Sequence, residues 1–543
     1  MRSNSRQRSP SPLPIRRQPA ETAAPRVPAS NRRSAALILA AAVLWLEPSF
    51  FAAFAAGEEG GAVKSTIRVA QPVPRTLDPH RVFTNAESAV IANIYESLTF
   101  FNAEGQLQPV LAESWQRTSE KTWRFELRQG VRFQSGELLT ARDVQYSFER
   151  GKSKRYNYIP DTVVTVQPLT ENSLEIVTSR PDPDLPRRLV GFYIVSSQSG
   201  AELETSANGT GPFRAREFRP AEKLSLVANQ DHWKAPPALS SIEYINYPSQ
   251  DAAFEALAAG KIDLTPINPF VAVEIDQESD RLWVFSVLSP SLTLLYLDTD
   301  RPPFSNRAVR KALDLALDRR EIADVALMGY ARPCPRVPTS LFSHQEEPQA
   351  SAAPDLEEAR RLLEEEGFPN GLKLLFGRIG DPDNDSESFG RVYRVIKEQL
   401  SRVGIQVEFK FFDTFETLLE AKKQGAIQIF LMILIDEVLD ATNIYASLYH
   451  SSRAYEGLYH LDGQDQDLTA RIDELLDLAS QADQDSRSER LREVSLLLAE
   501  ERFDLPLLRG ISLWGGRKTL EWQPRFDTLI LGVDFGADSG LTE

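Results

Sequence analysis

Residues 372–435 constrain the fold more than any other part of the sequence, because strand-like and helix-like periods alternate there. The run begins with the apolar segment LKLLF, and residues 386–403 then place apolar side chains at helical spacing. Residues 405–411 alternate apolar and polar side chains as a strand does, a second helix is expected from Asp413, and the apolar run 427–435 ends the unit. This order predicts a βαβαβ unit with a parallel sheet.

Ligands of such sheets bind beyond the carboxyl ends of the strands, so two loops become candidates for a binding site. They are residues 377–386, after the first strand, and residues 435–443, after the third. Among the charged side chains of these loops, the candidates for the site are Arg378, Asp381, Asp436, Glu437 and Asp440.

The chain has 543 residues, which exceeds what one hydrophobic core usually organises and predicts two or more lobes. Beyond residue 55 it has 53 basic against 75 acidic residues, a net charge near -22. Such a surface repels phosphate backbones, so we expect no nucleic-acid partner.

Cys334 is the single cysteine, which excludes an intrachain disulfide and a cysteine-based metal cluster.

The N-terminal segment reads as a targeting signal. Residues 1–33 are rich in Arg, Ser and Pro, and residues 34–46 form an uncharged apolar run of about the length of a signal-peptide core. Small residues favour cleavage after Ala55. The alternative is an uncleaved anchor over residues 35–56, which would bury Glu47 near the middle of the membrane.

The sequence lacks the strings that mark common enzymes: a nucleophile elbow, HExxH, a Walker A loop and a dinucleotide-binding GxGxxG. Its five histidines are scattered without the spacing that places two metal ligands on one helix face. We therefore expect neither a catalytic residue nor a metal or other cofactor. A glycosidase with two carboxylates stays open at this point, because acids are abundant throughout the body.

Three blocks of sequence together resemble the family 5 extracellular solute-binding proteins of ABC importers, whose members bind peptides or nickel. The first block contains LDPH (77–80), YESL (95–98), LAESW (111–115) and LTARDVQYSFER (139–150). The second contains GTGPF (209–213), LVANQDHW (226–233) and AFEALAAGKIDL (253–264). The third contains PPFSNRAVRKALDLALDRREI (302–322), GYARP (329–333) and RVGIQVEF (402–409).

The resemblance implies an α/β, two-lobed periplasmic-binding-protein-like fold of type II with an extra inserted subdomain. Lobe I would be discontinuous, the inserted subdomain would interrupt it, and lobe II would contain the βαβαβ unit. The implied ranges are 65–97, 206–287 and 510–543 for lobe I, 98–205 for the inserted subdomain and 288–509 for lobe II, after a signal peptide or anchor in 1–55.

Peptide-binding members of the family carry a motif like W-x-x-D-Y-x-D-P, whose first Asp receives the peptide's ammonium. Here Leu434 stands in place of the Trp, Glu437 in place of the first Asp and Asp440 in place of the second acid. Val438 and Ala441 also depart from the pattern, and Asp436 lies beside Glu437 as a substitute. The alternative is that these acids only cap the helix after residue 440.

The resemblance also implies that a peptide backbone adds as a strand beside Phe83, Thr84 and Asn85.

The expected function is that of an exported, periplasmic and monomeric binding protein. It would capture a small peptide or other small solute and deliver it to ABC transporter permease subunits. Membrane association would come through the permease or through the uncleaved anchor. The alternative is a ligand-sensing or enzyme-like relative that keeps the clamp and not the peptide site.

Overall fold

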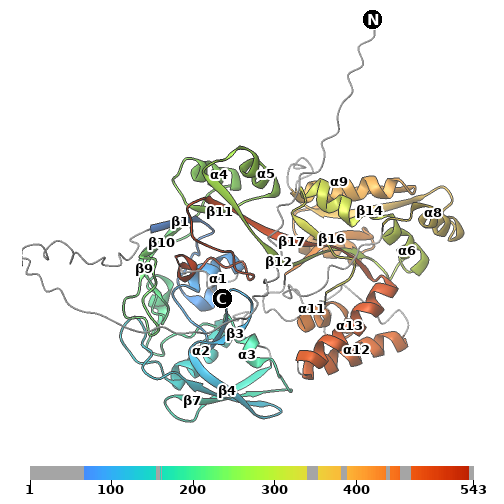
Figure 1. Cartoon of the computed structure of the whole chain (residues 1–543). Coiled ribbons are helices and arrows are strands. Elements are labelled where there is room, and N and C mark those ends of the chain that lie inside the picture. The colour runs from blue at the N-terminus through green and yellow to red at the C-terminus, as the bar shows by residue number, and fades with distance from the viewer. Residues whose placement is uncertain are drawn as a thin grey trace, which may run out of the picture. The chain divides into compact units, whose positions relative to one another are not determined.

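The computed structural model describes residues 66–82, 84–154, 159–160, 162–338, 353–380, 388–435, 441–452, 466–482 and 484–536 (Figure 1). The expected signal peptide or anchor in residues 1–55 lies outside this range. None of the helices in the described part of the chain is both long enough and apolar enough to cross a membrane.

Two long strands, β12 (Leu282–Leu297) and β17 (Asp504–Arg517), run through the middle of an 11-stranded sheet. They pair antiparallel from Leu282 opposite Arg517 to Tyr296 opposite Asp504. The register shifts between Leu288 and Leu292, which is the signature of a β-bulge. On one side of the bulge β17 pairs with β11 (Leu264–Pro266), and on the other side β12 pairs with β16 (Ile429–Ile435). Figure 1 shows β12 and β17 passing from the elements beside α4 and α5 to those beside α9 and β14.

The half of the sheet before the bulge, with its helices, forms what we name lobe I, whose core runs from Val69 to Phe535. The strands of lobe I follow β17 in the sheet in the order β11-β1-β10-β9-β8. Besides β11, its elements are β1 (Thr66–Ala70), η1 (Pro79–Arg81), α1 (Asn85–Ile91), β8 (Phe213–Arg219), β9 (Lys223–Ala228), β10 (Ser241–Ile245), α4 (Gln250–Ala258), α5 (Pro269–Glu278) and η5 (Gly532–Asp534).

A separate core from Leu98 to Ile194 marks the inserted subdomain, which has its own four-stranded sheet in the order β4-β5-β7-β6. Its elements are β2 (Thr99–Phe101), β3 (Leu107–Pro109), β4 (Ala112–Ser119), β5 (Thr122–Leu127), α2 (Ala141–Lys154), β6 (Val163–Pro168), β7 (Ser173–Thr178) and α3 (Leu185–Arg188), followed by η2 (Ala201–Glu204). Tyr193, Val195 and Leu203 pack in the lobe I core instead. The ranges expected from sequence for the three parts remain a proposal.

Lobe II has the largest core, from Leu292 to Leu508, and contains the βαβαβ unit. The unit consists of β14 (Leu372–Ile379), α9 (Ser388–Ser401), β15 (Ile405–Phe412), α10 (Phe415–Lys423) and β16, and β14 pairs parallel with both other strands. The remaining elements are α6 (Arg307–Ala316), α7 (Arg319–Glu321), η3 (Ile322–Ala326), β13 (Ala331–Pro333), α8 (Leu356–Glu365), α11 (Ala441–Tyr449), α12 (Gln466–Gln481) and α13 (Gln484–Glu501).

The predicted βαβαβ unit is therefore confirmed, with one correction at the start of α10. The sequence predicts a start at Asp413, whereas Thr414 is the N-cap and forms a capping box with Thr417. The hydroxyl of Thr414 accepts the N–H of Thr417, which satisfies a donor that has no partner within the helix.

A buried polar cluster joins lobe I to the inserted subdomain. The Arg150 guanidinium of α2 donates to both carboxylate oxygens of Asp78, at 2.8 and 2.5 Å, and its NH1 lies 3.0 Å from Nδ1 of His80. The Nε2 atom of His80 lies 2.9 Å from the carbonyl oxygen of Tyr193. Burial lowers the pKa of His80 to about 4, so the ring is neutral and accepts from Arg150.

Close backbone approach, and not a left-handed φ, explains the glycines of GTGPF. A Cβ on Gly211 would lie 2.5 Å from the carbonyl oxygen of Ile94, which already accepts the N–H of Gly211 at 2.8 Å. Gly130, by contrast, has φ near +79° and open space around it.

We expect Gly211→Ala to destabilise the protein by about 3 kcal/mol, because the methyl group must push two backbone segments apart. Gly130→Ala is the matched control and should cost about 1 kcal/mol, since it strains φ without a clash. Urea unfolding of both variants measures the difference. Equal losses would show that the approach to Ile94 does not require glycine.

Asp534, in the C-terminal segment, makes the stability of lobe I depend on pH. Burial raises the pKa of Asp534 to about 6, against the attraction of Arg525, whose guanidinium lies 3.7 Å away. The unfolded carboxyl ionises near 3.8, so the folded state loses stability as the pH rises from about 4 to about 6.

Replacing Asp534 by Asn should remove this loss. The free energy of unfolding of the variant should therefore exceed that of the wild type by roughly 2–3 kcal/mol at pH 7.5 and by little at pH 4. Urea unfolding followed by the fluorescence of Trp514 and Trp522, both in the lobe I core, measures it. The opposite pH dependence of His80 is common to both proteins and cancels in the difference. A gain that is the same at both pH values would contradict the assignment.

Candidate functional site

The carboxyl ends of β14 and β16 lie at one edge of the lobe II sheet. The two strands run parallel, with Phe376 opposite Ile429 and Gly377 opposite Phe430, so both carboxyl ends point the same way. β14 ends at Ile379, and β16 continues past that level to Ile435. This is the edge at which parallel sheets bind ligands, as the sequence predicts for the loops that begin there.

Arg378, one of the predicted site residues, is only 6% exposed and lies between two aromatic rings. Its guanidinium carbon is 5.2 Å from the ring centre of Tyr393 on α9 and 5.3 Å from that of Phe411 on β15. Burial raises the pKa of Tyr393 to about 12, against the effect of Arg378, so the ring remains a neutral phenol. The aromatic faces stabilise the cation, so a buried positive charge lies near the carboxyl end of β14.

The last residues of β16 divide between the core and the surface. Leu434, another predicted site residue, is half-buried and packs against the lobe II core, opposite Leu292 of β12. Its neighbours Ile433 and Ile435 are 44% and 55% exposed. Because side chains alternate along a strand, these two isoleucines lie on the opposite face from Leu434 and form an exposed apolar patch. The sequence pattern did not single them out, since the whole run reads as a buried strand.

In lobe I the structure describes part of the segment expected beside a peptide backbone. Thr84 is exposed and extended, and it caps α1 by accepting the N–H of Glu87 at 3.3 Å and donating to its carboxylate at 2.9 Å. Asn85 is the first residue of α1. The structure thus brings Thr84 and Asn85 to the start of a helix.

Five of the predicted site residues lie outside the described residues: Phe83, Asp381, Asp436, Glu437 and Asp440. The acids of residues 436–440 directly precede α11, which begins at Ala441. Both roles considered for them, binding an ammonium group and capping this helix, remain open.

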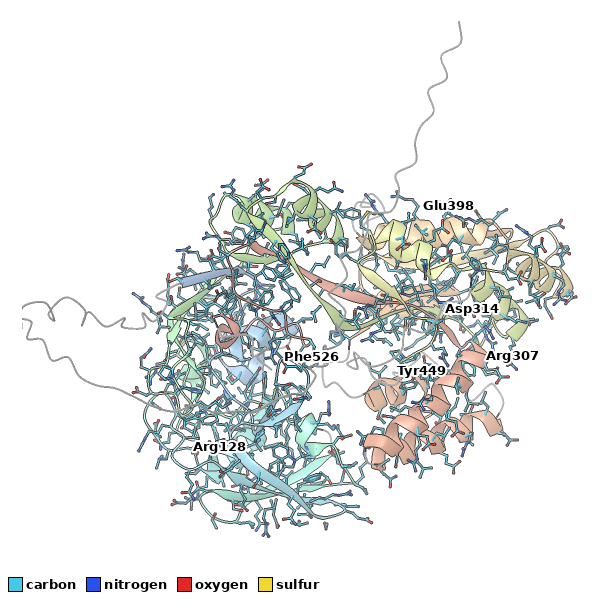
Figure 2. All side chains as sticks on the ribbon, viewed as in Figure 1. Arg128, Arg307, Asp314, Glu398, Tyr449 and Phe526 are labelled. Carbon is cyan, nitrogen blue, oxygen red and sulfur yellow. The ribbon has the colours of Figure 1, made fainter. Side chains whose placement is uncertain are left out.

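Two tyrosines that the sequence did not single out hold α11 in place. The Tyr445 hydroxyl donates to the carbonyl oxygen of Val337 at 2.7 Å, and the Tyr449 hydroxyl donates to a carboxylate oxygen of Asp504, the first residue of β17 (Tyr449 is labelled in Figure 2). Burial, reinforced by the charge of Asp504, raises the pKa of Tyr449 well above its ordinary value. The helix that follows residues 436–440 is therefore anchored to one of the two long strands.

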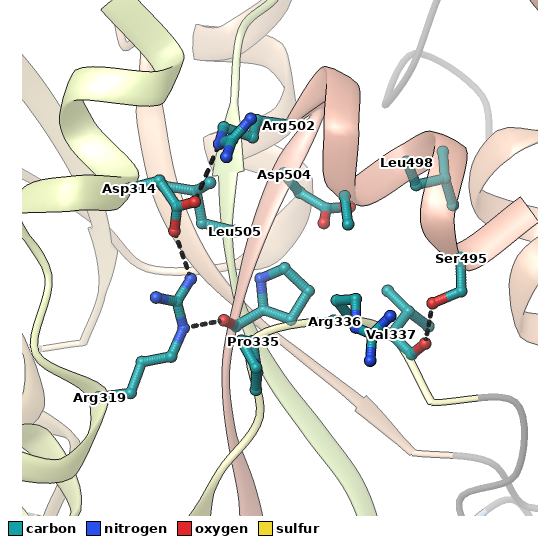
Figure 3. Close-up of a pocket in the computed structure, with 12 residues that line it drawn as sticks. Asp314, Arg319, Pro335, Arg336, Val337, Ser495, Leu498, Arg502, Asp504 and Leu505 are labelled. Carbon is teal, nitrogen blue, oxygen red and sulfur yellow. Dashed lines mark hydrogen bonds and ion pairs between the residues drawn. The ribbon is translucent and has the colours of Figure 1, made fainter. Parts of the chain in front are cut away.

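A small cavity in lobe II, shown in Figure 3, is not a ligand site. The Asp314 carboxylate accepts from Arg319 at 2.7 Å and from Arg502 at 2.9 Å, so two guanidinium groups already neutralise its charge. The cavity measures about 10 Å³, which is the space of about one water molecule.

A cavity of about 410 Å³ in lobe I is larger, but two of the charged groups that line it, Asp263 and Arg517, pair with each other. The Asp263 carboxylate accepts from Nε of Arg517 at 2.9 Å and from the backbone N–H of Arg68 at 2.8 Å. Within the described ranges, no group of three or more His, Cys, Asp or Glu side chains is arranged to hold a metal ion.

The fold is shared with solved two-lobed periplasmic binding proteins. HbpA2 from Haemophilus parasuis superposes with a TM-score of 0.75 at 19% identity, covering 87% of this chain and 99% of that one. DppA from Helicobacter pylori, solved in complex with the peptide STSA, superposes with a TM-score of 0.66 at 20% identity, covering 86% and 98%. The protein thus has the α/β, type II fold of these binding proteins.

Residues 106–456 match the family model of bacterial extracellular solute-binding proteins, family 5 Middle. The nickel-binding protein NikA of Staphylococcus aureus is 26% identical over 337 residues, which is 60% of this chain and 66% of that protein. The glutathione-binding protein GsiB of Pectobacterium atrosepticum is 27% identical over 369 residues, which is 64% and 70%. The matches thus span about two thirds of the length of these relatives. The chain belongs to the family 5 extracellular solute-binding proteins, whose members here are binding proteins and not enzymes.

The exposure of the apolar patch on β16 can be tested without knowing a ligand. Ile435→Thr keeps the β-branched shape and should change the free energy of unfolding by less than about 0.5 kcal/mol, because the side chain is already half in water. Leu434→Ala should cost about 1–2 kcal/mol, because it removes packing from the lobe II core. Thermal unfolding of the two variants compares them. A loss for Ile435→Thr as large as that for Leu434→Ala would mean that the isoleucine belongs to the core.

Proposed function

We propose that this protein is the exported, periplasmic substrate-binding component of an ABC importer. It captures a short peptide or another amine-bearing solute between its two lobes and delivers it to the permease subunits in the membrane. It acts as a monomer, associated with the membrane through the permease or through an uncleaved N-terminal anchor.

The observation that carries the proposal is the edge of the lobe II sheet, where β16 leads directly into an acidic segment in a protein of this family. Acids at the carboxyl end of a parallel strand suit a cationic group on a ligand, and Glu437 has the length to pair with an ammonium. An ion pair enclosed between two lobes loses its water, so removing one partner costs about 3–5 kcal/mol. Relatives named for glutathione binding and solved with a bound peptide support a ligand of this class.

A second candidate function is a ligand-sensing or enzyme-like relative that keeps the clamp and has lost the peptide site. It is favoured by the departures from the peptide motif at Leu434, Val438 and Ala441. Nickel is a further solute to test because NikA is among the relatives, although the described residues present no cluster of metal ligands.

We expect purified residues 56–543 to show a raised thermal midpoint with at least one peptide in a panel of di- to pentapeptides, sugars, opines and nickel. A ligand at one hundred times its Kd adds about 2.7 kcal/mol to the stability of the folded state, which is a readily measured shift.

Glu437→Ala should abolish that shift, because the ammonium of the ligand would lose its partner. The control is Glu364→Ala, which removes the same charge from an exposed position on α8 and should keep the shift. An equal response in Glu437→Ala would refute the ammonium role. Hydrolysis of an added ligand would favour the enzyme-like alternative.

A further inference from the structure

An ion pair joins the inserted subdomain to lobe II. Asp184, the residue before α3, pairs through its carboxylate with the guanidinium of Arg487 on α13. The two side chains are 20% and 11% exposed, so the pair is largely shielded from water. Such shielding strengthens the attraction relative to an ion pair on the open surface.

The local structure places Asp184 rigidly on its side of the contact. The next residue, Leu185, is fully buried in the core of the inserted subdomain. Asp182, two residues earlier, accepts from the Thr162 hydroxyl at 2.6 Å and from Arg188 at 3.0 Å. The carboxylate of Asp184 therefore projects from a turn that is held on both sides.

Arg487 is held just as firmly on the lobe II side. Its Nε donates to the carbonyl oxygen of Ala479 at 3.2 Å and its NH2 donates to that of Ala482 at 2.8 Å. These carbonyls belong to the end of α12 and the turn that follows, so the guanidinium occupies the turn between α12 and α13. Its NH1 is the atom that faces Asp184.

The contact matters because of where the chain connects the two parts. The described residues of the inserted subdomain contribute no strand to the 11-stranded sheet, and that sheet passes into lobe II through β12 and β17. If the lobes open by rotation about the irregularity in those strands, α13 moves away from α3 and this ion pair breaks. It therefore favours the closed arrangement over the open one.

We propose that Asp184 and Arg487 form a latch that keeps the lobes partly closed before a ligand arrives. Both are positioning residues, since they act on ligand capture through the lobe equilibrium. The effect on affinity rests on the proposed function, because it requires that the ligand bind the closed form. The apparent Kd then scales inversely with the fraction of molecules already in the binding-competent arrangement.

Small-angle X-ray scattering of the ligand-free protein tests the latch directly. Asp184→Asn should enlarge the radius of gyration, and the double charge reversal Asp184→Arg with Arg487→Asp should restore the wild-type value. Asp231→Asn, the same substitution at an exposed position 87% accessible to water, is the control and should change nothing. Raising the salt concentration should enlarge the wild-type protein but not the Asn variant, since added ions weaken an attraction that only the wild type has.

An unchanged radius of gyration in Asp184→Asn, with wild-type thermal stability, would overturn the latch. This result would leave the proposed function untouched, because no ligand is present in the measurement. Once a peptide ligand is known, Asp184→Asn should raise its Kd by about three- to ten-fold without changing which peptides bind. A changed peptide preference would instead place Asp184 in contact with the ligand and refute its role as a positioning residue.

Discussion

The pairing of β12 with β17 is the interaction on which the rest of this structure depends. These strands are the shared spine of two separate cores, with lobe I packed around one end and lobe II around the other. Backbone hydrogen bonds hold the two strands together along their length, yet the ladder is interrupted at Ser289–Ser291. Opposite this interruption lies Gly510, where a Cβ would come within 2.8 Å of the Ser291 hydroxyl oxygen. A second register shift, between Thr293 and Leu294, lies close to the first, and the ladder is regular from Leu282 to Leu288 and from Leu294 to Tyr296. Such a localised irregularity allows the strands to bend there without loss of either core.

Buried polar contacts connect elements that are distant in the sequence. The Asp78, His80 and Arg150 cluster ties the inserted subdomain to lobe I with charge-assisted hydrogen bonds in a buried setting. In lobe II, Tyr449 links α11 to β17, so the helix after the acidic segment is fixed to the spine.

The described part of the candidate site contains the enclosed cation of Arg378 near the end of β14 and two exposed isoleucines at the end of β16, and an acidic stretch of sequence follows. Arg378 does not project into solvent, because two aromatic faces enclose it. Ile433 and Ile435 do face solvent, which is unusual for β-branched residues in a strand so apolar.

The sequence alone determined the local architecture of lobe II and the family. The βαβαβ order and the apolar face of the helix at 388–401 follow from hydrophobic period, which is a property of neighbouring residues. Only the tertiary structure decided that Arg378 is enclosed, that Leu434 packs inward between two exposed isoleucines, and that Asp184 meets Arg487. The physical reason is that burial and ion pairing depend on which distant segments come together, and spacing along the chain carries no record of that.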